Sequence, residues 1–213
     1  MVDDHPLVRE GLAQIIDRQK DLACCGGVDC LLALQSAIAE HHPDLVTIDI
    51  LLQHGDGLEM IGFLKTEYPS LATLVISQCD ETLYAERALR AGARGYVMKE
   101  RATEEVLTAI RTILGGELYV SPRIAALALR KMIGTHLKNN DGDVGNLSDR
   151  ELQVLQLLGA GLGTRKIAAR LGLSVKTIET HRENIKHKLG ISDAAGLVHY
   201  ATDWLNGQSK RPD

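Results

Sequence analysis

One short stretch of the chain, residues 45–49, limits the fold more than any other. Its first four residues are apolar or β-branched, and a single carboxylate, Asp49, follows them. This pattern is typical of a short buried strand with Asp49 at its carboxyl end. Further short apolar runs alternate with segments of helical periodicity, at residues 1–2, 22–27, 71–77 and 95–98. Strands that alternate with helices predict a parallel sheet covered on both faces.

The first part of the chain therefore has an α/β pattern. Helical segments are expected at about residues 6–18, 30–41, 57–68, 83–91 and 104–114. Five alternating units of this size predict a flavodoxin-like, doubly wound, five-stranded parallel sheet. A further helix is expected from its cap Ser121 to about residue 137, before a polar linker at residues 138–145.

Polar side chains follow several of the predicted strands. Asp3 and Asp4 follow the first run, Ser77 ends the fourth and Lys99 follows the fifth. Because ligands bind at the carboxyl ends of parallel strands, these side chains are candidates to meet Asp49. Clustered carboxylates repel one another unless a cation neutralises them, and oxygen ligands favour a hard cation such as Mg²⁺. Taken singly, each residue also has an ordinary interpretation as a turn, a cap or a surface charge.

Residues 147–213 have a different pattern, with helices only. The residues whose hydroxyls are suited to cap these helices are Ser148, Thr164, Ser174 and Ser192. A short helix, a tight turn and a longer, more polar helix form a helix-turn-helix. The chain has a net charge of −4, but residues 1–146 carry −7 and residues 147–213 carry +3. The basic second part is therefore the one expected to meet a polyanion.

The composition excludes several classes of protein. No apolar run is long enough to span a membrane and no signal-peptide pattern opens the chain, so we expect a cytoplasmic protein without membrane contact. The four Cys residues show no metal-like pairing with His, and we expect them to be small buried hydrophobes in a reducing compartment.

Residues 1–118 resemble a CheY-like receiver domain. The residues that carry the resemblance, in order and at matching spacing, are Asp3-Asp4, Asp49, Asp56-Gly57, Ser77, Tyr96 and Lys99. The resemblance implies that Asp49 accepts a phosphoryl group. It implies that Mg²⁺ is held by Asp3, Asp4, Asp49 and the backbone carbonyl of Leu51. It also implies that Lys99 contacts the phosphoryl oxygens, that Ser77 swings to donate a hydrogen bond to them, and that Tyr96 then rotates inward.

Three features depart from the receiver pattern. Leu52-Gln53 replace the usual Met-Pro, which we expect only to soften the loop. Leu51 and Cys79 lie two residues after Asp49 and Ser77, and because neither side chain orients water well, we expect a slowly decaying aspartyl phosphate. Only two residues precede Asp3, and we expect the natural protein to begin upstream, because each missing buried aliphatic residue would forgo roughly 1.5–3 kcal/mol.

Residues 147–206 resemble the LuxR-type four-helix DNA-binding domain. The matching stretches are residues 147–151, 166–168, 171–174, 176–182 and 188–190. Ile178, Ile185 and Leu189 fall on one face of the third helix, so we expect the opposite face to enter the major groove of double-stranded DNA. The side chains expected to contact DNA are Lys166, Lys176, Thr177, Glu179, Thr180, Arg182, Glu183 and Lys186. For the two Glu residues, a solvated surface position is an equally good interpretation.

Together the two resemblances imply a response regulator of the NarL/FixJ class, with a receiver at 1–118, a linker at 119–146 and a DNA-binding domain at 147–213. Such a protein is a transcription regulator and not an enzyme. A partner histidine kinase phosphorylates it, and it forms a homodimer when phosphorylated or bound to DNA. Two alternatives remain, a DNA-binding regulator whose receiver works without phosphorylation, and a phosphotransfer or protein-interaction module with little DNA binding. A steep salt dependence of DNA binding would argue against the second.

Overall fold

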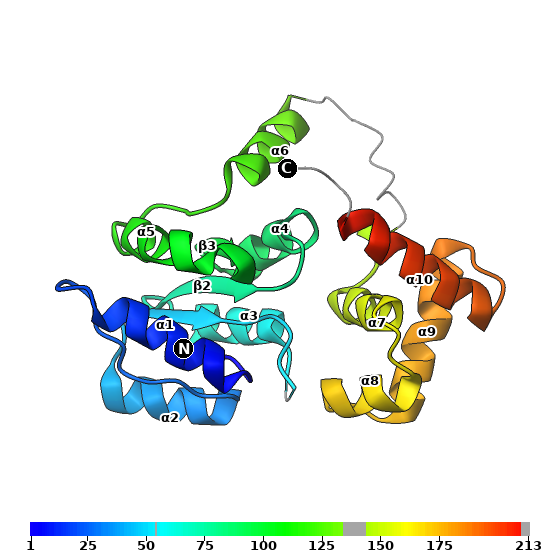
Figure 1. The fold of residues 1–213 in the computed structure, drawn as a ribbon, viewed down its shortest axis with the longest axis horizontal. Helices are drawn as coiled ribbons and strands as arrows, with labels where there is room; N and C mark the ends of the chain where they lie inside the picture. Colours follow the sequence, from blue (N-terminus) through cyan, green and yellow to red (C-terminus); the bar gives the residue numbers. More distant parts are fainter. Residues whose placement is uncertain (54, 134–143, 210–213) are drawn as a thin grey trace. The chain divides into compact units, whose positions relative to one another are not determined.

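A computed structural model of the chain describes residues 1–53, 55–133 and 144–209 (Figure 1). It contains two compact units, Met1–Gly134 and Thr135–Asp213. Most of the predicted polar linker, and the last residues of the helix predicted before it, lie outside the described residues. None of the helices within these ranges is both long and apolar enough to cross a membrane.

The first unit is built on a parallel sheet. Its strands are β1 (Leu45–Ile48), β2 (Ala72–Ser77) and β3 (Gly95–Met98), paired in the order β1-β2-β3. On the other side of β1, Val2 pairs in parallel with both Ile48 and Val28. The spatial order is therefore Val28, Val2, β1, β2, β3, which confirms the predicted flavodoxin-like arrangement.

The first two predicted strands are shorter than the sequence indicates. Within them, only Val2 pairs with a neighbour, and residues 22–27 form no strand. The residue that pairs with Val2 on that edge is Val28, one position beyond the predicted strand at 22–27. Two glycines at positions 26 and 27 precede Val28. Glycine weakens a strand because it has no side chain to pack, which accounts for the loss of regular pairing there.

Helices cover both faces of this sheet. The helices of this unit are α1 (Pro6–Asp17), α2 (Leu31–His41), α3 (Gly57–Glu67), α4 (Glu81–Ala91), α5 (Ala102–Leu114), which follows the short 3-10 helix η1 (Lys99–Arg101), and α6 (Pro122–Met132), which packs on α4 and not on the sheet. α1 and α5 lie on one face, and α3 and α4 on the other (Figure 1). The core on the α1 and α5 side is aliphatic and includes Leu12, Ile16, Leu74, Ile76, Val97, Val106, Ile110 and Ile113.

The start of α3 lies against the end of β1. Asp56 caps the helix, because its carboxylate accepts the N–H of Leu58 at 2.8 Å. A Cβ atom at Gly57 would lie 2.3 Å from the carbonyl oxygen of Asp49. Only glycine permits so close an approach, so Gly57 allows α3 to support the backbone at Asp49.

The second unit is helical in the part that the structure describes. It contains the 3-10 helix η2 (Val144–Asn146) and the helices α7 (Asp149–Gly159), α8 (Thr164–Leu171), α9 (Val175–Leu189) and α10 (Ala194–Ser209). Ser148 and Ser174 cap α7 and α9 as predicted, and Ser148 forms a reciprocal capping box with Glu151. Ile178 and Ile185 are buried, which confirms the predicted inner face of α9.

Two predicted caps in this unit were wrong by one residue. Thr164 is the first residue of α8, and Gly163 occupies the cap position. α10 begins after Asp193, whose carboxylate accepts the N–H of Gly196 at 2.8 Å, so Asp193 and not Ser192 caps this helix. Asp and Ser have similar capping preference, and the backbone geometry decides between neighbours.

Candidate functional site

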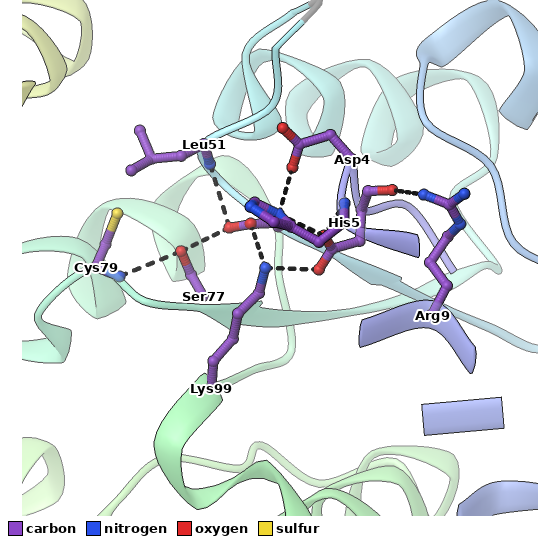
Figure 2. Close-up of polar contacts among 9 residues, drawn as sticks. Asp4, His5, Arg9, Leu51, Ser77, Cys79 and Lys99 are labelled. Carbon is purple, nitrogen blue, oxygen red and sulfur yellow. Dashed lines mark hydrogen bonds and ion pairs between the residues drawn. The ribbon is translucent and has the colours of Figure 1, made fainter. Parts of the chain in front are cut away.

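The carboxyl edge of the sheet in the first unit brings together the side chains predicted there. Asp49 follows β1, Ser77 ends β2 and Lys99 follows β3. Asp3 lies beside them because Val2 pairs with β1, where its carbonyl accepts the N–H of Asp49 at 2.9 Å. Figure 2 shows Ser77, Lys99 and Asp4 converging from separate segments on one point.

Asp49 is the centre of a hydrogen-bond network, and its residue surface is only 4% exposed. Its Oδ1 accepts the Ser77 hydroxyl at 2.7 Å and the N–H of Leu51 at 3.2 Å. Its Oδ2 lies 2.6 Å from Nζ of Lys99, which is also 2.6 Å from Oδ2 of Asp3. Lys99 therefore bridges two carboxylates that would otherwise repel each other.

Burial and charge act in opposite directions on this network. Burial raises the pKa of Asp49 above its ordinary value, because it outweighs the opposing effects of Lys99 and Ser77. For Lys99, burial favours the neutral amine, but the charge of Asp49 and the hydrogen bonds to Asp3 and Asp49 outweigh it and raise the pKa. Lys99 therefore stays a cation, and any further cation at this edge would favour the ionised form of Asp49.

Asp4 is a buried carboxylate at the same edge. Its side chain is 6% exposed, and neither oxygen makes a hydrogen bond of normal geometry with a described residue, although Nδ1 of His5 lies 2.8 Å from Oδ1. The metal-binding atoms of Asp3, Asp4, His5 and Asp49 all lie within 4.8 Å of one another. A buried carboxylate with so few donors, in a cluster with excess negative charge, fits a divalent cation such as Mg²⁺.

Tyr96 points into the core. The residue is 1% exposed, and its hydroxyl donates to the backbone carbonyl of Cys79 at 2.7 Å. Burial raises the pKa of Tyr96 well above its ordinary value, so it remains a neutral donor. The structure thus has Tyr96 in the inward position and Ser77 bonded to Asp49, which is one of the two arrangements that the resemblance implies.

Two side chains at this edge were missed by the sequence reasoning. Nδ1 of His5 approaches both Asp3 and Asp4, and Arg9 donates to the backbone carbonyl of Asp3 (Figure 2). His5 directly follows the acidic pair, so its position in the chain was a usable signal. Nothing in the sequence indicated the Arg9 contact, because it depends on the direction in which α1 leaves the sheet. The predicted metal-binding role of the Leu51 carbonyl stays a prediction.

In the second unit, most residues predicted to contact DNA are exposed. Those exposed on α8 and α9 are Lys166, Lys176, Glu179, Thr180 and Glu183. Thr177 is half-buried, and its N–H donates to the cap Ser174 at 3.0 Å. The exposed residues of α9 among them, Lys176, Glu179, Thr180 and Glu183, face away from the buried Ile178 and Ile185, as the helical periodicity predicts.

Three basic residues of α9 have partners inside the unit. Arg182 donates to the hydroxyl of Thr164 on α8. The Lys186 side chain is 16% exposed, with its ammonium 2.9 Å from Glu183. Lys188, near the end of the helix, lies 2.6 Å from the buried carboxylate of Glu151. These charges are therefore less available to a polyanion than that of Lys176.

Comparison with known proteins identifies both units. Residues 1–111 match the response regulator receiver domain family, and residues 145–201 match the LuxR family of bacterial regulatory proteins. The oxygen regulatory protein NreC of Staphylococcus aureus is 32% identical over 209 residues, which cover 94% of this chain and 94% of NreC. The chain is a two-component response regulator. It belongs to the NarL/FixJ class, with a receiver followed by a LuxR-type helix-turn-helix domain.

Solved structures agree with the fold of this response regulator. RcsB from Salmonella enterica serovar Typhimurium, bound to promoter P1flhDC in the presence of the phosphomimetic BeF3-, aligns with a TM-score of 0.67 and 24% identity, over 95% of this chain and 96% of RcsB. A LuxR-family response regulator from Aurantimonas sp. SI85-9A1 aligns with a TM-score of 0.57 and 30% identity, over 62% of this chain and 94% of its own. Response regulators of this class are phosphorylation-controlled, DNA-binding transcription factors and not enzymes, and receiver domains generally bind Mg²⁺ at the phosphorylation site.

Proposed function

We propose that Asp49 is the phosphorylated residue of this response regulator. The observation that carries the proposal is the meeting of Asp49 with Ser77, Lys99 and the acidic pair Asp3-Asp4 at one edge of the sheet. A carboxylate oxygen of Asp49 attacks the phosphorus atom presented by a partner histidine kinase, and the leaving imidazole departs. Lys99 and the Ser77 hydroxyl then stabilise the phosphoryl oxygens by charge and by hydrogen bonding.

Mg²⁺ fits this edge, where Asp3, Asp4, Asp49 and the backbone carbonyl of Leu51 would hold it. When bound, it would supply positive charge for the carboxylates and the phosphoryl oxygens. The chain's own residues prepare the reaction. Lys99 orients Asp49 at 2.6 Å, and burial of the carboxylate limits its access to water.

We further propose that residues 1–118 act as the receiver, that 119–146 form the linker, and that 147–213 bind double-stranded DNA. Lys166 and Lys176 would contact phosphates, while Glu179, Thr180 and Glu183 would face base edges in the major groove. Thr177, Arg182 and Lys186 would contribute at the margins of this surface. A homodimer, formed in the cytoplasm on phosphorylation or on DNA, would place two such helices on two half-sites.

The decisive experiment is intact mass after incubation of the full chain with Mg²⁺ and a small phosphodonor. We expect one added phosphoryl group in the wild type and none in Asp49→Asn. Asp44→Asn is the matched control, because it makes the same chemical change at the opposite end of β1 and should still be labelled. Labelling of Asp49→Asn at the wild-type rate would overturn the assignment.

Duplex DNA binding in both states separates the alternatives. Affinity that falls steeply with salt and rises on phosphorylation supports the switched regulator. Salt-dependent binding that is identical in both states supports a receiver that works without phosphate. Phosphorylation without DNA binding would support a phosphotransfer or protein-interaction module.

A further inference from the structure

The ring of His5 lies at the edge of the carboxylate cluster, where the proposed phosphoryl chemistry gives it no role (Figure 2). Nδ1 lies 2.8 Å from Oδ1 of Asp4 and 3.2 Å from Oδ1 of Asp3. The backbone N–H of the same residue donates to Asp3 at 2.8 Å, which fixes where the side chain starts. The ring is 44% exposed, while both carboxylates are 6% exposed, so His5 stands between the buried acids and solvent.

These separations match those of neighbouring ligands around one ion. Two ligand atoms at about 2.1 Å from a divalent ion and at right angles are about 3.0 Å apart. The two distances from Nδ1 fall on either side of that value. The buried Asp4 carboxylate also points to an ion, because apart from its contact with Nδ1 of His5 its oxygens have no hydrogen-bond partner among the described residues.

The excess negative charge of this cluster also favours binding of a divalent cation. Three carboxylates, those of Asp3, Asp4 and Asp49, lie around the single ammonium of Lys99, which reaches Asp3 and Asp49. When all three acids are ionised, two negative charges remain in excess of Lys99, and one remains when the guanidinium of Arg9 at the backbone carbonyl of Asp3 is also counted. The ligand set, however, is not composed of oxygen alone, because the imidazole nitrogen belongs to the same group of atoms within 4.8 Å.

We propose that Nδ1 of His5 is a further ligand of this metal centre and gives it a preference for first-row transition ions over Mg²⁺. Imidazole nitrogen suits ions such as Fe²⁺ and Zn²⁺, whereas Mg²⁺ takes oxygen ligands. Mn²⁺ has the weakest affinity of the divalent first-row series and serves here as the paramagnetic probe. The inference rests on the proposed function, because it concerns the same centre. The competing role is that of a positioning residue, in which His5 holds Asp3 and Asp4 and never touches the ion.

Pulsed electron paramagnetic resonance distinguishes the two roles directly. Metal-free full chain would be loaded with one equivalent of Mn²⁺, and the echo modulation of coupled ¹⁴N measured. We expect imidazole ¹⁴N modulation in the wild type and in His41→Ala, and none in His5→Ala. His41 is the matched control, because it is an exposed histidine of the same unit at the end of α2. Bound Mn²⁺ without ¹⁴N modulation in the wild type would overturn the inference.

Affinities provide the second measurement. Titration of free Mn²⁺, with Mg²⁺ as competitor, should show that His5→Ala weakens Mn²⁺ binding by roughly tenfold or more and Mg²⁺ binding by much less. Roughly tenfold is the lower end of the loss seen when a residue that only supports a ligand is replaced, so the difference between the two ions identifies the ligand role. Equal weakening for both ions would contradict a ligand role. The wild-type spectrum needs no variant, so a folding defect in His5→Ala cannot hide the result.

The outcomes also separate this inference from the proposed function. If Mn²⁺ binds without nitrogen coupling while Asp49 is phosphorylated with Mg²⁺, only the role of His5 fails. If neither ion binds the wild type and no phosphoryl group is added to Asp49, both fail together.

Discussion

The hydroxyl of Tyr96 donates a 2.7 Å hydrogen bond to the backbone carbonyl of Cys79. The backbone N–H of Cys79 in turn donates to the Ser77 hydroxyl at 3.3 Å, and that hydroxyl donates to Asp49 at 2.7 Å. One residue, Cys79, therefore links the carboxylate to the buried aromatic ring through its two peptide groups. A phosphoryl group on Asp49 would change what Ser77 bonds to, and the effect would reach Tyr96 through this single step.

Replacement of Tyr96 by Phe tests this link. Loss of the hydroxyl leaves the buried Cys79 carbonyl without this donor, and we expect the free energy of unfolding to fall by about 1 kcal/mol or somewhat more. We also expect the ratio of DNA affinities between the phosphorylated and unphosphorylated protein to shrink. Urea unfolding and DNA titration in both states would measure the two effects. Tyr68→Phe, the same change at the end of α3, should alter neither, and an unchanged affinity ratio in Tyr96→Phe would contradict the link.

The raised pKa of Asp49 predicts a pH-dependent stability. Burial is its main cause, so the folded state favours the protonated acid more than the unfolded state does. The stabilising contribution is complete below the unfolded-state pKa of about 3.9 and is lost as the pH rises through the folded-state pKa. Asp49→Asn does not ionise, so its free energy of unfolding should rise relative to that of the wild type as the pH increases through the folded-state pKa of Asp49.

Urea unfolding of both proteins between pH 4 and pH 8, without metal, would show the divergence. Asp44→Asn should follow the wild type, since Asp44 is exposed at the other end of β1. A stability difference between Asp49→Asn and the wild type that stays constant over this range would argue against the burial of an ionised Asp49.

Local patterns predicted the fold well where short-range hydrogen bonds decide the structure. The caps Ser121, Ser148 and Ser174 are of this kind, because each accepts an N–H three residues further along. The carboxyl edge was also predictable, since parallel strands bring Asp49, Ser77 and Lys99 to one side regardless of the helices between them.

Contacts between distant parts of the chain could not be predicted in the same way. Arg182 is still expected to contact DNA, but its hydrogen bond to Thr164 on the preceding helix could not be predicted from the sequence. Lys188 was part of a matching motif, and the structure pairs it with Glu151. Such pairings depend on the angles at which α7, α8 and α9 cross, and the helical periodicity of the sequence does not specify these angles.

The lifetime of the phosphoryl group on Asp49 should be long. Cys79 is 2% exposed, and burial raises the pKa of its thiol to about 12, so it offers no base to an attacking water. Leu51, on the other side, is apolar. We expect Leu51→Glu to shorten the lifetime by one order of magnitude or more, because a positioned general base contributes roughly 10²–10⁴-fold. Loss of label from purified phosphoprotein measures it, with Leu51→Met as the apolar control. Rapid loss from the wild type would refute the prediction.

Substitution of two lysines of α9 should affect different properties, DNA binding for Lys176 and stability for Lys188. Lys176 is exposed near the start of the helix, so Lys176→Ala should weaken DNA binding and reduce the slope of log affinity against log salt by about 0.9, the value for one phosphate contact. The free energy of unfolding of Lys176→Ala should differ from that of the wild type by less than about 0.5 kcal/mol. Fluorescence anisotropy with duplex DNA at several salt concentrations would provide the slope.

Lys188 instead stabilises the fold. For Glu151, burial favours the neutral acid, but the hydrogen bonds from Lys188 and Ser148 outweigh it and lower the pKa. Lys188→Ala should therefore destabilise the second unit by roughly 1 kcal/mol at neutral pH, the value of a typical hydrogen bond. The loss should diminish as the pH falls through the folded-state pKa of Glu151, where the wild type loses the same contribution. The salt slope of DNA binding should stay at the wild-type value. A reduced slope with unchanged stability would mean that Lys188 leaves Glu151 to contact DNA.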